Sequence, residues 1–159
     1  MDYDFEKLND VWARVTGANE DSVQYQDGRP ADAEKIGSFI TDAEELSVFY
    51  SEIAHRCRTK SQILRRLAAE EKDAIRRLQT AHFLLTGDTC PVSKGPSVQG
   101  STLDALREAY MAENDTADAY RSAAISSGNG SVTDLFSALS ERASDHAATL
   151  RDIIAEFMS

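Results

Sequence analysis

The sequence has few of the residues that interrupt helices or cross-link a chain. Its 159 residues include 3 prolines, 8 glycines and 2 cysteines. Cys57 and Cys90 do not form a CxxC pair, which excludes a zinc ribbon and a four-thiolate iron site. Two cysteines also cannot make a disulfide framework. The scarcity of proline and glycine instead permits long, uninterrupted helices.

Positive charge and long apolar runs are also scarce. The formal net charge is -10, which argues against a nucleic-acid-binding surface because phosphates would be repelled. No apolar run approaches the roughly 18 residues needed to span a membrane. The first ten residues, MDYDFEKLND, are acidic and predict neither a signal peptide nor a transit peptide. We therefore expect a cytoplasmic protein that binds neither nucleic acid nor membranes.

Helix-forming residues dominate, and their apolar spacing predicts five helical segments. A short helix containing Trp12 is expected at about 4–15, followed by a polar linker. Four long helices are expected at about 33–58, 60–86, 101–125 and 131–157. Gly87 is the expected end of the second long helix. Ser101 and Ser131, each followed by Asp at the third position after it, are the expected starts of the last two.

The lengths of the connections predict how the helices are arranged. Short links join the first long helix to the second and the third to the fourth, so each pair should form an antiparallel hairpin. The segment GDTCPVSKGPSVQG (87–100) is long enough to cross from one end of a bundle to the other. We therefore expect an all-α protein with the ferritin-like topology of two hairpins joined by one long crossover. Residues 1–32 would form the extra N-terminal helix and linker, and 33–159 the four-helix bundle.

The inward positions of the long helices follow the alternating 3,4 spacing of bundle cores. They are predicted to be buried and comprise Ile36, Ile40, Ala43, Ser47, Tyr50, Ala54, Cys57, Leu64, Leu67, Glu71, Ala74, Leu78, Ala81, Leu106, Tyr110, Glu113, Ala117, Tyr120, Ala124, Leu139, Ala143, His146, Leu150, Ile153 and Phe157. Three of these residues are ionisable: Glu71, Glu113 and His146. Burying a carboxylate without a partner is costly, so the three need each other, water or a cation.

Four stretches of the sequence resemble the rubrerythrin-type domains of the ferritin-like superfamily. They are EELSVFYSEIA, LAAEEKDAIRRLQTAHFLLTG, EAYMAENDTADAYRSAA and ASDHAATLRDII, all within 35–157. In such domains each hairpin supplies one Glu from its first helix and a Glu-x-x-His from its second, and the six residues bind two irons. The resemblance places these six positions at Ala43, Glu71, Ala74, Glu113, Ala143 and His146. Half of the ligand set has therefore been replaced by alanine.

The remaining ligands all belong to one metal position. The resemblance makes Glu113 and His146 terminal ligands of that metal and Glu71 a bridging ligand, whereas Ala43 and Ala74 stand where the other metal would have its terminal ligands. One histidine and two carboxylates can hold a single Fe, Zn or Mn ion with water in the open positions. The resemblance thus implies a degenerate di-iron centre that binds at most one metal ion. An active enzyme of this kind would be a rubrerythrin-like metal-dependent oxidoreductase, but the loss of one metal's ligands argues against paired-iron chemistry.

A metal-free interpretation of the same residues stays open. Protonated His146 between Glu71 and Glu113 would form a buried polar network without any cofactor. The protein would then be a non-catalytic structural or interaction bundle. In either case we expect the protein to form a homodimer, because bundles of this type commonly pair through helix faces.

Two further sets of residues have alternative interpretations. An unusual two-metal site would need neighbours of the inward positions, namely Glu70, Asp73, Glu141 or Asp145. These lie about 100° or more around their helices and are expected to face solvent. Tyr50 and Tyr120 are candidate hydrogen-bond donors to a metal ligand, and the competing interpretation is that both are ordinary core aromatics.

Overall fold

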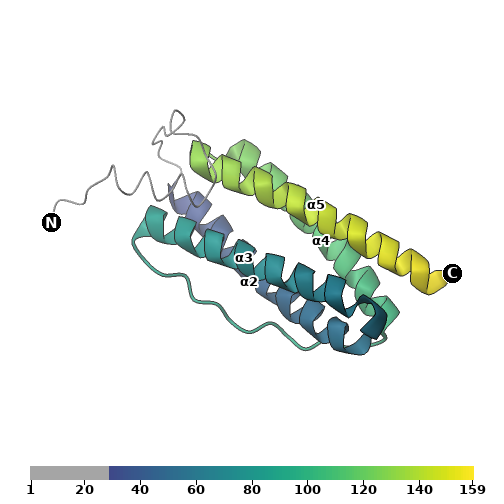
Figure 1. Ribbon diagram of the computed structural model, residues 1–159. Helices are drawn as coiled ribbons and strands as arrows, with labels where there is room; N and C mark the ends of the chain where they lie inside the picture. Colours follow the sequence, from purple (N-terminus) through teal and green to yellow (C-terminus); the bar gives the residue numbers. More distant parts are fainter. Residues whose placement is uncertain (1–28) are drawn as a thin grey trace.

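The computed structural model describes residues 29–159. Within that range the chain forms four long helices, a short 3₁₀ turn and no strand (Figure 1). The elements are α2 (Arg29–Arg56), η2 (Arg58–Lys60), α3 (Ser61–Thr86), α4 (Thr102–Ser126) and α5 (Gly130–Met158). The predicted all-α architecture is confirmed for this part of the chain. The predicted helix at 4–15, with Trp12, lies outside the described residues.

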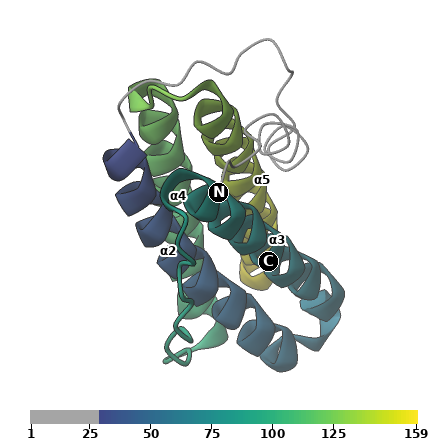
Figure 2. The same cartoon turned by 90° about the vertical axis from the view of Figure 1, so that its left-hand side faces the viewer.

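The four helices are arranged as two antiparallel hairpins, α2 with α3 and α4 with α5 (Figures 1 and 2). The segment between α3 and α4 runs along the bundle from one end to the other. Near its start, the side-chain amide of Gln79 donates a hydrogen bond to the carbonyl of Cys90 at 3.2 Å. Near its end, Arg56 at the end of α2 donates to the carbonyl of Val98 at 2.7 Å. The segment between α3 and α4 therefore runs along α2, as the number of residues in that segment predicts.

Two of the predicted helix boundaries are formed by the expected residues. Gly87 adopts the left-handed conformation, with φ of 78°, and its N–H donates to the carbonyl of Phe83 at 2.7 Å. Glycine favours this conformation because it has no Cβ. Ser101 caps α4: its hydroxyl oxygen accepts from the N–H of Asp104 at 3.1 Å and donates to the Asp104 carboxylate at 2.6 Å. The predicted capping residue is therefore confirmed.

The start of α5 differs from the prediction. Its cap is Asn129, whose side-chain oxygen accepts a hydrogen bond from the N–H of Val132 at 3.1 Å. Ser131, the predicted cap, lies inside the helix and is fully buried. The polar run SSGNG contains several residues able to cap a helix, and Asn is at least as good a cap as Ser. The local sequence alone therefore does not select between them.

Nearly all of the predicted inward positions are buried. The exceptions are Tyr110, which is half-buried, and Phe157, which is 44% exposed. Ile153 is the last buried residue of α5. The final turn of the helix contains no buried residue, so the inward stripe continues in sequence after the core has ended.

The core consists of two apolar clusters along the bundle. One includes Ile36, Leu78 and Phe136, and the other includes Ile53, Leu64 and Leu150. On α3, α4 and α5 the ionisable inward residues fall between the segments that form these two clusters. The polar site is therefore placed in the middle of the bundle, with apolar packing on both sides.

Candidate metal centre

Glu71 of α3, Glu113 of α4 and His146 of α5 meet in the interior of the bundle. Their exposed fractions are 7%, 0% and 1%, respectively. The Nδ1 atom of His146 lies 3.0 Å from an oxygen of Glu71 and 3.0 Å from an oxygen of Glu113. One ligand atom from each residue lies within 4.8 Å of the other two. The structure thus brings together the three ionisable residues that the helical spacing places on the inward faces.

The other three positions of the six-ligand pattern are filled by buried methyl groups. Ala43, Ala74 and Ala143 are all in the core. None of them can donate an electron pair to a metal, and their burial means that they occupy the interior rather than the surface. The described residues contain one group of three or more potential metal ligands, and it consists of Glu71, Glu113 and His146.

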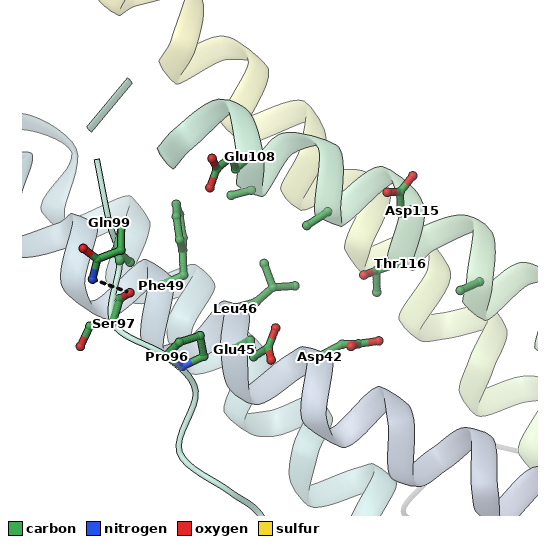
Figure 3. Close-up of a pocket in the computed structure, with 14 residues that line it drawn as sticks. Asp42, Glu45, Leu46, Phe49, Pro96, Ser97, Gln99, Glu108, Asp115 and Thr116 are labelled. Carbon is green, nitrogen blue, oxygen red and sulfur yellow. Dashed lines mark hydrogen bonds between the residues drawn. The ribbon is translucent and has the colours of Figure 1, made fainter. Parts of the chain in front are cut away.

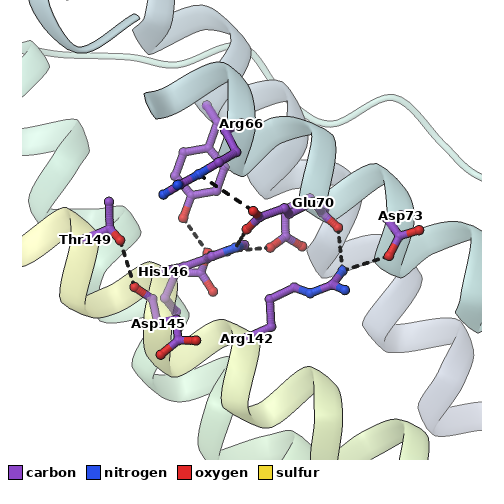
Figure 4. Close-up of polar contacts among 10 residues, drawn as sticks. Arg66, Glu70, Asp73, Arg142, Asp145, His146 and Thr149 are labelled. Carbon is purple, nitrogen blue, oxygen red and sulfur yellow. Dashed lines mark hydrogen bonds and ion pairs between the residues drawn. The ribbon is translucent and has the colours of Figure 1, made fainter. Parts of the chain in front are cut away.

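Glu70 also reaches this site, contrary to the prediction that it faces solvent. Its side chain is 38% exposed, but one carboxylate oxygen lies 2.6 Å from Nε2 of His146 (Figure 4). The helical period gives only the direction of the Cα–Cβ bond of Glu70, which points away from the core. A glutamate is long enough to bend back around the helix, so the carboxylate contacts the buried ring while the stem lies at the surface. The feature of the sequence that could have indicated this contact is the adjacent pair Glu70–Glu71, because Glu71 is an inward residue.

The other neighbours of the inward positions do not join the site. Arg142 donates to the carbonyl of Glu70 at 3.0 Å and to the carboxylate of Asp73 at 3.1 Å (Figure 4). Partial burial alone would raise the pKa of Asp73, but its hydrogen bond to Arg142 and the nearby arginine charges lower it overall. Asp73 is therefore an ion-pair partner. Glu141 and Asp145 are exposed, as predicted.

Tyr50 is hydrogen-bonded to the site, whereas Tyr120 is not among its partners in the described structure. The Tyr50 hydroxyl donates a short hydrogen bond to Oε1 of Glu113. Burial and the charge of Glu113 raise the pKa of Tyr50 well above its usual value, so the hydroxyl keeps its proton. The Tyr120 ring instead packs on Phe39, with 4.1 Å between ring centroids. Of the two tyrosines, Tyr50 alone donates a hydrogen bond to one of the three inward ionisable residues in the described structure.

One carboxylate oxygen at the centre of the site has no partner. Oε1 of Glu113 accepts from Tyr50 and contacts His146, but Oε2 of Glu113 is buried and makes no hydrogen bond within the described part of the chain. Burying an acceptor of this kind without a donor is unfavourable, more so when it is charged. A cation or a water molecule would satisfy it.

The charges around His146 favour its protonated form. Burial alone would lower the pKa of His146, but the hydrogen bonds and charges of Glu113 and Glu71 outweigh it and raise the pKa to about 10. For Glu71, burial raises the pKa and the charge of Glu113 adds to this, while His146 opposes both. At neutral pH, imidazolium N–H groups can therefore point at Glu71 and Glu113 from Nδ1 and at Glu70 from Nε2.

The same arrangement can accept a metal ion in place of one proton. If Nδ1 carries a lone pair, it can face a cation together with the carboxylates of Glu71 and Glu113. Nε2–H would still donate to Glu70, and metal-binding histidines almost always donate their second N–H to such an acceptor. One nitrogen and carboxylate oxygens suit Zn, Fe or Mn. The donor set therefore fits a single divalent cation.

Comparison with known proteins finds no matching family model, no similar curated protein and no similar solved structure. Within residues 29–159, no helix is both long enough and apolar enough to cross a membrane.

Proposed function

We propose that the protein is a ferritin-like, rubrerythrin-type bundle that binds one Fe, Zn or Mn ion through Glu71, Glu113 and His146. The observation that carries this proposal is the buried, unpartnered Oε2 of Glu113. It belongs to a carboxylate whose other oxygen lies 3.0 Å from Nδ1 of His146, and the same nitrogen lies 3.0 Å from a carboxylate oxygen of Glu71. Two hairpins joined by a crossover along the bundle support the ferritin-like assignment. The alanines at the other three ligand positions support one metal rather than two.

Glu70 has a defined role in this proposal. It accepts the Nε2–H of His146 and so fixes the ring with Nδ1 facing the two ligand carboxylates. Tyr50 has a comparable role for Glu113, because its hydroxyl holds one carboxylate oxygen and leaves the other free for the cation. The ligands are thus held in place by neighbours that do not themselves contact the metal.

The competing proposal is a metal-free polar network in a non-catalytic structural or interaction bundle. The distances from Nδ1 of His146 to Glu71 and Glu113 favour it, because both are ordinary hydrogen-bond lengths for a protonated ring. The raised pKa of His146 has the same implication. This alternative gives Oε2 of Glu113 a water molecule as its partner.

Metal content of the purified protein distinguishes the two proposals. The protein should be isolated without chelator, and the parent compared with Glu113→Gln and with Glu141→Gln as an exposed control. The metal proposal expects about one equivalent of Fe, Zn or Mn per chain in the parent and control, and far less in Glu113→Gln. A parent that neither contains these metals nor takes one up on titration would establish the metal-free network. Two equivalents with an oxo-bridge absorption would contradict both.

A cytoplasmic homodimer remains part of the proposal. A sedimentation mass of one chain at micromolar concentration would contradict the proposed dimer.

A further inference from the structure

A groove with a volume of about 670 Å³ lies between α2, α4 and the crossover segment, apart from the ligand residues described above. Figure 3 shows Leu46 and Phe49 projecting from α2 toward α4, with Pro96 and Gln99 of the crossover at one end. The volume falls within the roughly 300–1,000 Å³ typical of small-molecule sites. The groove is therefore large enough for an organic ligand and far larger than a metal ion needs.

The floor of the groove is apolar because α4 presents small side chains there. Ala109, Ala112, Thr116 and Ala119 follow one another at helical spacing along the groove. Ala109 is buried and Ala112 is half-buried against the neighbouring apolar cluster. Side chains of this size do not fill the space opposite Leu46 and Phe49, so an apolar surface stays accessible.

The crossover forms a fixed wall of the groove. The N–H of Val98 donates to the carboxylate of Glu52 at 2.8 Å, and Arg56 donates to the carbonyls of Val98 and Gly100 at 2.7 Å and 3.1 Å. At Gly95 the backbone passes so close to α2 that an added Cβ would lie 2.8 Å from the Cα of Glu45. This wall is attached at several points, and the shape of the groove is thereby set.

The sides of the groove carry negative charge that no basic residue among 31–159 balances. Its polar lining includes the carboxylates of Asp42, Glu45, Glu108 and Asp115, and it includes no Lys, Arg or His. None of these four carboxylates forms an ion pair with a basic residue of the described structure. Partial burial is the main cause that raises the pKa of Asp42, and repulsion by the charge of Glu45 adds to it. A cation in the groove would relieve this repulsion.

We propose that the groove binds a small amphiphilic organic cation. Its apolar body would lie on Leu46, Phe49 and the small residues of α4, and its protonated amine would face the carboxylates. An anionic ligand such as a fatty acid is disfavoured because it would meet four carboxylates without a counter-charge. A bare metal ion is disfavoured because it would leave the apolar floor exposed.

Octylammonium and octanoate are suitable probes because they share one apolar chain and differ in the sign of the charge. Binding would be measured by calorimetry on the full chain, in buffer with chelator so that the metal proposal does not enter. Methyl NMR spectra of Leu46, Ala109 and Ala112 would locate the bound chain. We expect octylammonium to bind at one site with shifts at these methyls, and octanoate to bind at least about tenfold more weakly.

Two kinds of variant test the location. Ala112→Phe should fill the floor and abolish binding, and circular dichroism would check that it folds. The surface pair Glu108→Gln and Asp115→Asn should weaken octylammonium about threefold or more while leaving octanoate unchanged or improved, because exposed charge pairs each contribute modestly. Glu141→Gln on α5, outside the groove lining, is the matched control and should leave both affinities unchanged.

Several outcomes would overturn the proposal. They are equal affinity for the two probes, absence of octylammonium binding at millimolar concentration, methyl shifts confined to another face, or binding that Ala112→Phe and the charge variants leave unaltered. None of these outcomes bears on metal binding by Glu113, so the two proposals fail independently.

Discussion

Replacing His146 with alanine should be far more damaging than replacing Glu71 with glutamine if the site holds no metal. The imidazole is the shared partner of three carboxylates, those of Glu70, Glu71 and Glu113. In the parent protein Glu113 has no exposed surface and Glu71 is 7% exposed, so water does not solvate either carboxylate. Two buried carboxylates would then face each other without the protonated imidazole of His146 between them.

The cost of this change can be estimated from the burial of the two groups. Removing one partner of a buried ion pair typically costs about 3–5 kcal/mol, because the remaining charge is neither solvated nor paired. Protonation of one carboxylate would limit the loss, so we expect a destabilisation of about 3 kcal/mol. Glu71→Gln removes one of the crowded negative charges and keeps an acceptor for His146. Its expected cost is about 1 kcal/mol, near that of one net hydrogen bond.

Thermal and denaturant unfolding of the parent and both variants, with and without chelator, provides the measurement. A metal-free network gives the order above and a parent melting temperature that chelator does not change. A bound metal makes the two losses similar instead, because both substitutions remove a ligand and chelator reproduces their effect in the parent. Equal effects near zero in the absence of metal would show that these side chains do not depend on one another, and the reasoning would be refuted.

Other predictions follow from individual contacts. In the metal-free protein, the pKa of His146 is raised from its ordinary 6.5 to about 10, so its contribution to stability is complete below about pH 6.5 and is lost as pH rises through 10. NMR titration of the ring should show this late transition, and an ordinary midpoint would contradict it. Glu70→Gln should weaken metal binding about tenfold without changing the stoichiometry, because it alters the acceptor that orients His146. An unchanged metal affinity would contradict the proposed role of Glu70 in orienting the ring. Gly95→Ala should destabilise the protein because its Cβ would lie 2.8 Å from the Cα of Glu45, whereas Gly37→Ala, with 3.9 Å to its nearest neighbour, should stabilise helix α2 by about 1 kcal/mol. Chemical denaturation of the pair measures this difference, and a matching loss in both would contradict the close-approach argument.

The residues that sequence reasoning located correctly are those whose position depends on helical period alone. Glu71, Glu113 and His146 occupy inward positions of three different long helices, and the helical period determines which residues of a helix share its inward face. Glu70 shows the limit of that reasoning, because its Cα faces outward while its flexible side chain reaches the buried ring. Side-chain reach depends on what lies within a few ångströms in three dimensions.

The same limit applies at helix ends and between helices. Asn129 rather than Ser131 caps α5. The sequence could not select between these two residues, which lie two positions apart, because Asn and Ser differ too little in their preference for the cap position. Phe157 continues the inward period after the core has ended. The groove between α2 and α4 could not be predicted, because it depends on how closely the hairpins approach and on the path of the crossover over Glu45.

The position of the polar residues between two apolar clusters has a consequence for how the helices align. Apolar helix surfaces tolerate sliding by one turn, since one aliphatic side chain can take the place of another. Here a one-turn shift of α5 would bring Ala143 or Leu150 opposite Glu113 in place of His146, and the buried carboxylate would lose its cation. A single buried polar group is known to specify register in helical assemblies in this way. Glu71, Glu113 and His146 would therefore also favour one register of the bundle over its one-turn alternatives.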